Sequence, residues 1–176
     1  MAVFTCAIVV ATFMMLVAAE PTNKTESAFT AKFTSNLDSV TYTNLRIVFD
    51  SVLTNIGDDY NPGDGKFTAS IPGTYVFSVT LMSKLSSDSA AFGCLHKNDI
   101  EQFCVWSNGY NAHEMSSNTI TLKLVKGDVV DVVLKAGSSY GIHNSGTAGY
   151  CSFTGFLLYP QESLLEKLQE AINRLN

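Results

Sequence analysis

The stretch from Asn55 to Val79, NIGDDYNPGDGKFTASIPGTYVFSV, constrains the fold more than any other part of the chain. Its first half is dense in residues that favour tight turns, namely Asp58, Asp59, Asn61, Pro62, Gly63, Asp64 and Gly65. Its second half alternates apolar and polar side chains, and a Pro-Gly break separates Phe67, Ala69 and Ile71 from Tyr75, Phe77 and Val79. Two short aromatic strands joined by a turn are typical of an all-β sandwich.

The rest of the chain continues this pattern. Alternating or apolar runs predict strands over Ala28–Thr34, Arg46–Leu53, Ala90–His96, Ile100–Trp106, Thr119–Val125, Val129–Leu134 and Tyr150–Tyr159. In all, the chain has about eight strands at short spacing, and no helical pattern interrupts them. This organisation predicts a single domain built as a two-sheet sandwich or jelly roll.

The N-terminus differs from this pattern. Residues 1–19 are apolar and carry no charged side chain, and Val17–Ala19 provides small residues for cleavage before Glu20. We therefore expect a signal peptide, followed by a short mature segment at residues 20–27. An uncleaved membrane anchor is the alternative, and the absence of a second long apolar run favours secretion to the extracellular space.

At the other end, residues 161–176 predict an amphipathic helix. Ser163 and Glu166 form a capping box. The apolar residues of the segment occur at the spacing of heptad positions a and d, at Leu165, Leu168, Ile172 and Leu175. A helix this short is marginal in water on its own. We expect it to pack against its own domain or against copies of itself.

The net charge of the chain limits the classes of partner that we expect it to bind. The 176 residues have a formal net charge of -5. A protein that binds nucleic acid needs a basic patch to displace counterions from phosphate, and docking on an anionic membrane needs similar cations. We therefore expect no nucleic-acid partner and no membrane insertion.

Several separated motifs resemble the C1q domain, the globular head of complement C1q. The first lies in the opening stretch and comprises Asn55, Gly57, Tyr60, Gly65, Phe67, Pro72, Gly73, Tyr75 and Phe77. The later motifs comprise Leu122, Leu124, Gly127 and Asp128, and then Phe153, Gly155, Phe156, Leu157 and Leu158. The resemblance covers residues 28–160, which we take as the globular domain.

The resemblance implies an all-β, ten-stranded jelly roll of the tumour-necrosis-factor type that assembles as a homotrimer. It implies a binding module without catalysis. The chain contains no collagen-like repeat and so resembles stalkless members of the family, many of which are lectin-like receptors of innate immunity that bind glycans on microbial surfaces. The alternative is a secreted trimeric ligand for a host cell-surface receptor, similar to tumour necrosis factor or cerebellin.

Three cysteines follow the expected signal peptide. Cys94 and Cys104 flank the predicted hairpin that turns at Lys97–Asp99, and complement C1q chains resemble this arrangement, with a cysteine pair in the same hairpin. We expect these two to form a disulfide that contributes about 2–3 kcal/mol, with two free thiols as the alternative. For Cys151, a buried thiol is favoured over a bridge between subunits.

Asn23 begins the chain's one N-glycosylation sequon, which predicts a glycoprotein.

Two patterns that suggest other chemistry lack the required context. Gly137–Gly141 fits the Gly-x-Ser-x-Gly pattern around Ser139, but a nucleophile elbow needs a helix after the serine. We therefore expect no enzyme. The acidic loop after Asn55 lacks the glutamate that ends an EF-hand loop, since Ser70 stands there. Some C1q-like trimers hold calcium through acidic residues before the last strand, and Ala136–Gly149 has none, so we expect no cofactor and keep calcium as an alternative.

The loops between strands are the expected ligand surface, because a rigid sandwich positions them. Three polar loops are candidates: Lys84–Ser89, Ser107–Asn118 and Ala136–Gly149. They carry aromatic, amide and imidazole groups of the kind that bind sugar rings and hydroxyls, at Tyr110, His113, Tyr140, His143 and Asn144. Solvation of an ordinary loop is the alternative interpretation for His113 and His143.

Overall fold

The computed structural model describes residues 24–85, 89–162, 168 and 171–174. The expected signal peptide at residues 1–19 and the sequon at Asn23 lie outside the described residues. In the expected C-terminal helix, residue 168 and residues 171–173 have helical conformation, while the capping box lies outside the described part. No helix in the described residues is long and apolar enough to cross a lipid bilayer.

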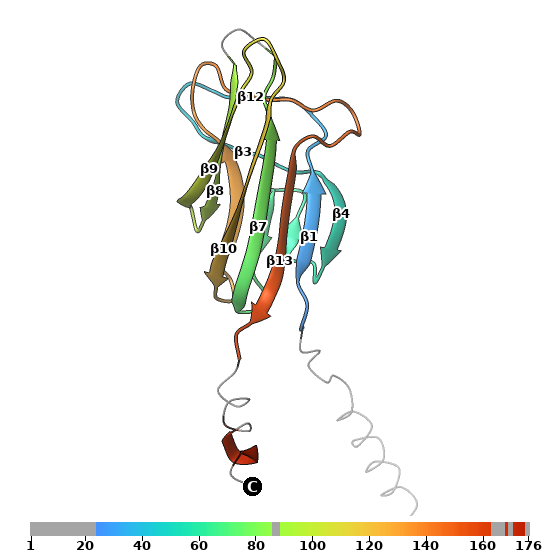
Figure 1. The fold of residues 1–176 in the computed structure, drawn as a ribbon, viewed down its shortest axis with the longest axis vertical. Helices are drawn as coiled ribbons and strands as arrows, with labels where there is room; N and C mark the ends of the chain where they lie inside the picture. Colours follow the sequence, from blue (N-terminus) through green and yellow to red (C-terminus); the bar gives the residue numbers. More distant parts are fainter. Residues whose placement is uncertain (1–23, 86–88, 163–167, 169–170, 175–176) are drawn as a thin grey trace, which may run out of the picture.

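The described residues form thirteen strands, which are arranged mainly in two facing sheets (Figure 1). The first sheet is antiparallel and contains, in spatial order, β10 (Met115–Leu124), β7 (Gly73–Met82), β13 (Ser152–Pro160), β1 (Ala28–Lys32) and β4 (Ser51–Ile56). We refer to it as the five-stranded sheet.

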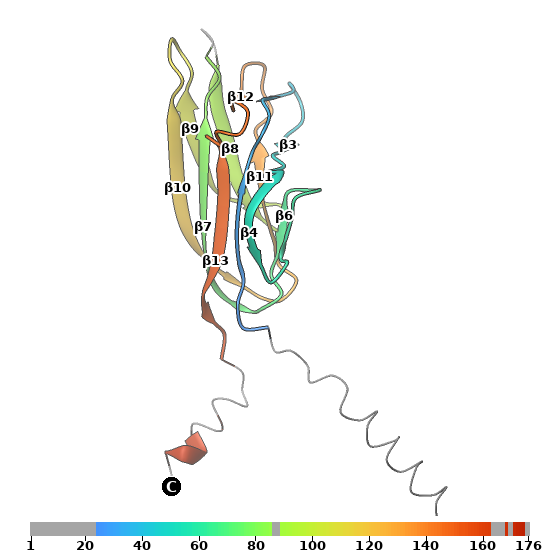
Figure 2. The same cartoon turned by 90° about the vertical axis from the view of Figure 1, so that its right-hand side faces the viewer.

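The second sheet lies behind the first, as the side view shows (Figure 2). Its order is β5 (Tyr60–Asn61), β6 (Lys66–Thr68), β11 (Val129–Leu134), β8 (Ala90–Lys97) and β9 (Ile100–Asn108), and β3 (Leu45–Arg46) pairs with β11. At one end of the sandwich, β2 (Leu37–Asp38) pairs with β12 (Gly141–Ile142). The chain crosses repeatedly between the sheets, so the predicted all-β jelly roll is confirmed.

An aromatic core fills the space between the two sheets. Phe153 of β13 is fully buried, and its ring centroid lies close to those of Phe29 (4.8 Å), Phe49 (5.7 Å), Phe77 (6.0 Å) and Tyr60 (6.1 Å). The alternation in β7 turns Tyr75, Phe77 and Val79 inward, as the sequence predicts. Large aromatic side chains dominate such a core because each removes a large apolar area from water.

The opening stretch has the predicted turns and the two predicted strands, β6 and β7, but β5 also forms within the first predicted turn and β6 ends at Thr68. The side chain of Asn55 closes the first turn, since its Nδ2 donates to the Tyr60 carbonyl at 2.9 Å and its Oδ1 accepts from the Tyr60 amide at 3.2 Å. Gly57 has φ 89°, a left-handed conformation that favours glycine. A Cβ there would also lie 2.9 Å from the Glu26 carbonyl oxygen.

The acidic residues of this stretch do more than make a turn. Asp59 in particular is buried. Its carboxylate pairs with Lys24 at 2.6 Å and accepts hydrogen bonds from the hydroxyls of Ser27 and Ser70. These bonds satisfy the buried charge and attach the segment before β1 to the rest of the domain.

The hairpin of β8 and β9 is confirmed, together with its cysteine pair. The turn residues Asn98 and Asp99 both have positive φ, at 50° and 63°, as a two-residue hairpin turn requires. Cys94 lies opposite Cys104 across the hairpin, and the two are joined by a disulfide. Cys151 is a free and buried thiol, as expected, and burial raises its pKa to about 11.

Some predicted boundaries were wrong. The run Arg46–Leu53 is not a single strand, because the chain leaves the second sheet after β3 and joins the first sheet at β4. Ile47 and Phe49 are buried during this crossing without belonging to either strand, whereas Leu53 is exposed. The loop expected over Ser107–Asn118 is shorter, because β9 and β10 extend into both of its ends.

Candidate ligand-binding site

Four connecting segments meet at the end of the sandwich opposite the C-terminal end of β13 (Figure 1). They are residues 33–44, 83–89, 109–114 and 135–151, of which residues 86–88 lie outside the described part. Backbone hydrogen bonds of 2.9–3.3 Å connect them, from Ser39 to Tyr140, Ser83 to Glu114, Lys84 to Gly141 and Gly137 to Val40. All three loops named from the sequence contribute, and we call this region the loop end.

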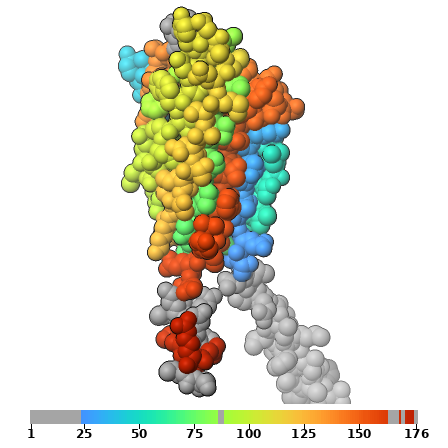
Figure 3. Space-filling model, viewed as in Figure 1, coloured from blue at the N-terminus to red at the C-terminus, as the bar shows by residue number. Residues whose placement is uncertain are grey.

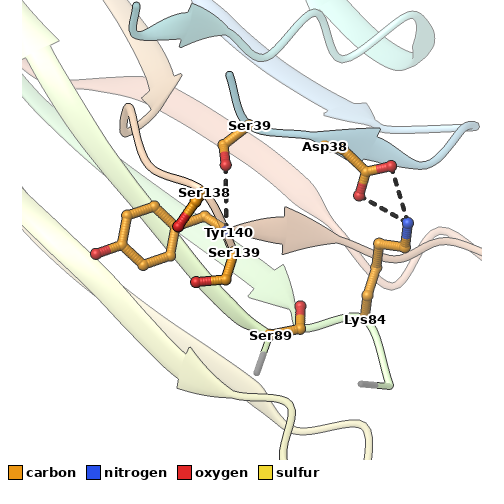
Figure 4. Close-up of a pocket in the computed structure, with 7 residues that line it drawn as sticks. All are labelled: Asp38, Ser39, Lys84, Ser89, Ser138, Ser139 and Tyr140. Carbon is orange, nitrogen blue, oxygen red and sulfur yellow. Dashed lines mark hydrogen bonds and ion pairs between the residues drawn. The ribbon is translucent and has the colours of Figure 1, made fainter. Parts of the chain in front are cut away.

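A pocket of about 290 Å³ lies at the loop end and is lined by Asp38, Ser39, Lys84, Ser89, Ser138, Ser139 and Tyr140. Figure 4 shows the ring of Tyr140 at one side of the pocket and the Lys84–Asp38 pair at the other, with serine side chains between them. Small-molecule sites in proteins begin at about 300 Å³. The pocket therefore has room for a ligand of about one sugar ring.

The charges in the pocket balance each other. Nζ of Lys84 lies 2.7 and 2.9 Å from the two carboxylate oxygens of Asp38. The two side chains are 33% and 69% exposed, and an ion pair so open to water adds little to stability. Its donors and acceptors can therefore exchange partners with a ligand, and the pair favours a polar ligand without net charge.

The serines of the pocket have two roles. The hydroxyl of Ser39 donates to the Gly137 carbonyl at 2.8 Å and accepts from the Tyr140 amide at 3.2 Å, which holds the loop that carries Tyr140. Ser138 and Ser139 are exposed and offer hydroxyls to the pocket. The Gly137–Gly141 pattern lies between β11 and β12 and not at a strand-to-helix turn, so its context is not that of a nucleophile elbow.

Tyr140 also belongs to an aromatic cluster, which we define as Phe92 of β8, Trp106 of β9 and Tyr140. The ring centroids are 5.1 Å apart for Phe92 and Trp106, and 5.4 and 5.6 Å from Tyr140 to these two rings. Phe92 and Trp106 lie opposite each other in the hairpin. Trp106 is 53% exposed, so the cluster is open to solvent at this residue.

A second group of rings joins two of the connecting segments. His113 and His143 stack with their centroids 4.3 Å apart, and Tyr150 lies 6.1 Å beyond His143. Nδ1 of His113 is 2.8 Å from the Ser83 carbonyl oxygen. Burial, the adjacent His113 ring and Lys84 hold the pKa of His143 below its ordinary value.

The lowered pKa of His143 predicts a loss of stability in acid. Between the folded and unfolded pKa values, the unfolded chain binds more protons, so the free energy of unfolding falls as the pH drops below about 6.5. Replacing His143 with Gln removes this titration, and we expect a smaller fall for the variant. Urea unfolding between about pH 7 and pH 5 measures the difference. An identical fall in both proteins would contradict the role of His143.

The five ligand-binding residues expected from the sequence do not lie together at one site in the structure. Tyr140 lines the pocket, while His113 and His143 form the stack. Tyr110 is 59% exposed in the loop between β9 and β10. Asn144 is buried, and its amide is engaged within its own loop, donating to the Gly146 carbonyl and accepting from the Tyr150 amide.

Several pocket and cluster residues were missed by the sequence reasoning. Asp38 lies in a segment without a motif, and Lys84 lies at the end of a loop. Trp106 lies in β9 between the buried residues Val105 and Ser107, and strand alternation turns it outward. The sequence alone offers no signal for this, because Ser107 is polar.

The described residues offer little to a metal ion. The group with suitable spacing consists of Cys94, Glu101 and Cys104, but its two cysteines are joined in the disulfide, which leaves no thiolate to bind. Asp59, in the acidic loop, is already occupied by Lys24 and two hydroxyls. Calcium binding stays an untested alternative.

Comparisons with known proteins identify the family of the chain. The model of the C1q domain matches residues 28–158. Zebrafish Caprin-2 is 34% identical over 147 residues, which are 83% of this chain and 15% of that protein. Mouse complement C1q tumor necrosis factor-related protein 7 is 30% identical over 126 residues, which are 72% of this chain and 43% of that protein. The chain thus spans less than half the length of these relatives.

A solved structure supports the same fold. The globular domain of the zebrafish complement 1qA protein superposes with a TM-score of 0.61 at 21% identity, covering 77% of this chain and 99% of that one. At this level of identity the likeness bears on the fold alone.

Proposed function

Because the chain belongs to the C1q domain family, we propose that it is a secreted recognition protein that binds neutral glycans, including those of microbial surfaces, through the loop end of a homotrimer. The observation that carries this proposal is the pocket, which combines a charge-balanced Lys84–Asp38 pair, serine hydroxyls and one side of an aromatic cluster. Hydroxyl-rich ligands need such paired donors and acceptors together with apolar surface.

The outer face of the five-stranded sheet supports the trimer. This face is toward the viewer in Figure 3. Across neighbouring strands, the register aligns one apolar row, Val76, Phe156, Ala28 and Ile56, beside a row of small hydroxyls, Thr119, Ser78, Thr154, Thr30 and Thr54. Phe156 is 40% and Ile56 46% exposed. Lys32 and Lys123 also lie on this face, outside the two rows. An apolar row beside small hydroxyls is suited to subunit contact.

Secretion is a further part of the proposal. It is supported by the signal-like residues 1–19 and by the disulfide of the β8–β9 hairpin, since disulfides persist in oxidising compartments. Glycosylation at Asn23 belongs to the same proposal. Trimerisation would bring three loop ends to one target, and avidity would then strengthen weak binding at each shallow pocket.

A glycan array probed with the purified protein, with and without calcium, tests the proposal. We expect binding to neutral glycans. Replacing Lys84 with Ala should weaken binding about tenfold, because a hydrogen bond from a charged donor contributes about 1.5–3 kcal/mol. Lys126→Ala is the matched control, since Lys126 lies in the turn between β10 and β11, away from the pocket. Absence of binding to every glycan, with capture of one host membrane receptor, would support the receptor-ligand alternative instead.

A further inference from the structure

The aromatic cluster adjoins the polar pocket through a residue that the two share. Tyr140 lines the pocket and packs against Trp106 with a centroid distance of 5.6 Å and an interplanar angle of 79°. Trp106 does not line the pocket but contacts Tyr140, so the pocket and the indole share this one tyrosine ring. A ligand in the pocket would contact the indole by extending past Tyr140.

The geometry of the cluster leaves indole surface open. Phe92 is tilted by 59° against Trp106, and Tyr140 meets it edge-on. Neither ring lies parallel to the indole, so neither stacks on it. Trp106 is 53% exposed although it lies in the middle of an ordered hairpin. The position of the indole is thus fixed by the strand and by its two aromatic neighbours, while a large part of it remains available.

The chemistry of this surface selects one class of ligand. A pyranose ring has a face of C–H groups and a rim of hydroxyls, and the C–H face packs favourably on an aromatic ring because the ring face carries partial negative charge. The pocket beside Tyr140 supplies donors and acceptors for the rim. Since Asp38 already neutralises Lys84, an anionic sugar or a phosphate finds no unpaired cation among the described residues that line the pocket.

We propose that Trp106 is the stacking subsite for the apolar face of a neutral pyranose whose hydroxyls bind in the Lys84–Asp38 pocket. This inference rests on the proposed glycan-binding function and specifies the ligand class and the residue that selects it. Tyr140 acts as the wall between the two subsites. Phe92 is a positioning residue, because it supports the indole from the opposite strand of the hairpin.

The fluorescence of Trp106 provides a specific probe of binding at this site. Trp106 is the only tryptophan among the 176 residues, so tryptophan emission reports on this side chain alone. We would titrate the full-length protein with methyl glycosides of galactose, glucose, mannose and N-acetylglucosamine, and follow both emission and the heat of binding. Stacking of a sugar removes water from the indole, so the emission should shift to shorter wavelength with the midpoint that calorimetry gives.

A pair of substitutions tests the contribution of the Trp106 side chain to binding. Trp106→Ala should lower the affinity for the preferred glycoside at least tenfold, because a stacked aromatic ring contributes a large share of a small ligand's contacts. Ile100→Ala is the control on the same strand, since Ile100 is 68% exposed and precedes the cluster by six positions. Circular dichroism establishes whether the variants are folded, and the emission of the unmodified protein provides a readout that needs no variant.

Each outcome of these titrations decides the inference. A blue shift of the Trp106 emission together with the loss of affinity supports it. Heat of binding without any change in emission would overturn the stacking role of Trp106 and leave glycan binding in place. Neither heat nor an emission change with any of the glycosides would overturn both the inference and the proposed function.

Discussion

Replacing Phe153 with Ala is expected to lower the free energy of unfolding by about 3–5 kcal/mol. Phe153 is fully buried at the centre of the aromatic core, with four other rings within 6.1 Å. The substitution removes buried apolar area and leaves a cavity between two sheets that are held apart by the remaining side chains. A loss of this size is a large fraction of the stability of an ordinary domain.

Urea unfolding followed by circular dichroism measures this effect. Tyr42→Ala is a suitable control, because it removes an aromatic ring that is 95% exposed and should change the free energy of unfolding by less than about 0.5 kcal/mol. If Phe153→Ala and Tyr42→Ala had equal effects, Phe153 would not be the centre of the core.

Replacing Phe156 with Asp is expected to dissociate the proposed trimer. Phe156 lies three residues after Phe153 in β13 but on the opposite face of the sheet, in the apolar row with Val76 and Ile56. At an interface that uses this face, each of three subunits would bury an unpaired carboxylate, and the effective penalty for each such ion is several kcal/mol. The monomer should remain folded, since the side chain faces outward.

Sedimentation equilibrium of the unmodified protein and of the variant measures this difference. We expect a trimer for the first and a monomer for the second at micromolar concentration. Ile100→Asp provides the control, because Ile100 is exposed on β9 of the second sheet and should leave the trimer intact. A variant that stays trimeric would show that the subunits meet through another surface.

Much of the fold could be predicted from local patterns. The turn residues and aromatic alternation of the opening stretch fixed two strands and their inward faces, because Gly57 meets a backbone requirement and Tyr75 and Phe77 obey the period of a strand. The hairpin around Asn98 and its disulfide followed from short-range spacing and from the family resemblance. These features depend on residues close together in the sequence.

The candidate site depends on contacts that are distant in the sequence, and most of it could not be predicted. Asp38 meets Lys84 across 46 positions, and the hydrogen bond between Ser39 and Tyr140 spans 101. Composition could indicate that the loops are polar, but not which of their residues meet. Asn144 is an example of a candidate residue for which composition suggested the wrong environment, since its amide is buried and stabilises its own loop.

The crossing between the sheets was missed for a similar reason. Ile47, Val48 and Phe49 are apolar and favour β-structure, so local propensity predicts a continuous strand. The tertiary structure instead uses the segment to pass from β3 to β4, and the Asp50 carboxylate accepts hydrogen bonds from the amide and hydroxyl of Thr34 at that point. Burial of Ile47 and Phe49 in the core outweighs the pairing that a longer strand would have given.

The most direct test of glycan recognition at the loop end is a crystal structure of the protein with the glycoside that binds most tightly in the titrations. We predict one sugar ring at each loop end, with its C–H face on the indole of Trp106 and its hydroxyls within hydrogen-bond distance of Lys84 and Asp38. A sugar bound at another surface, with an unchanged solvent-filled pocket beside Tyr140, would contradict this account.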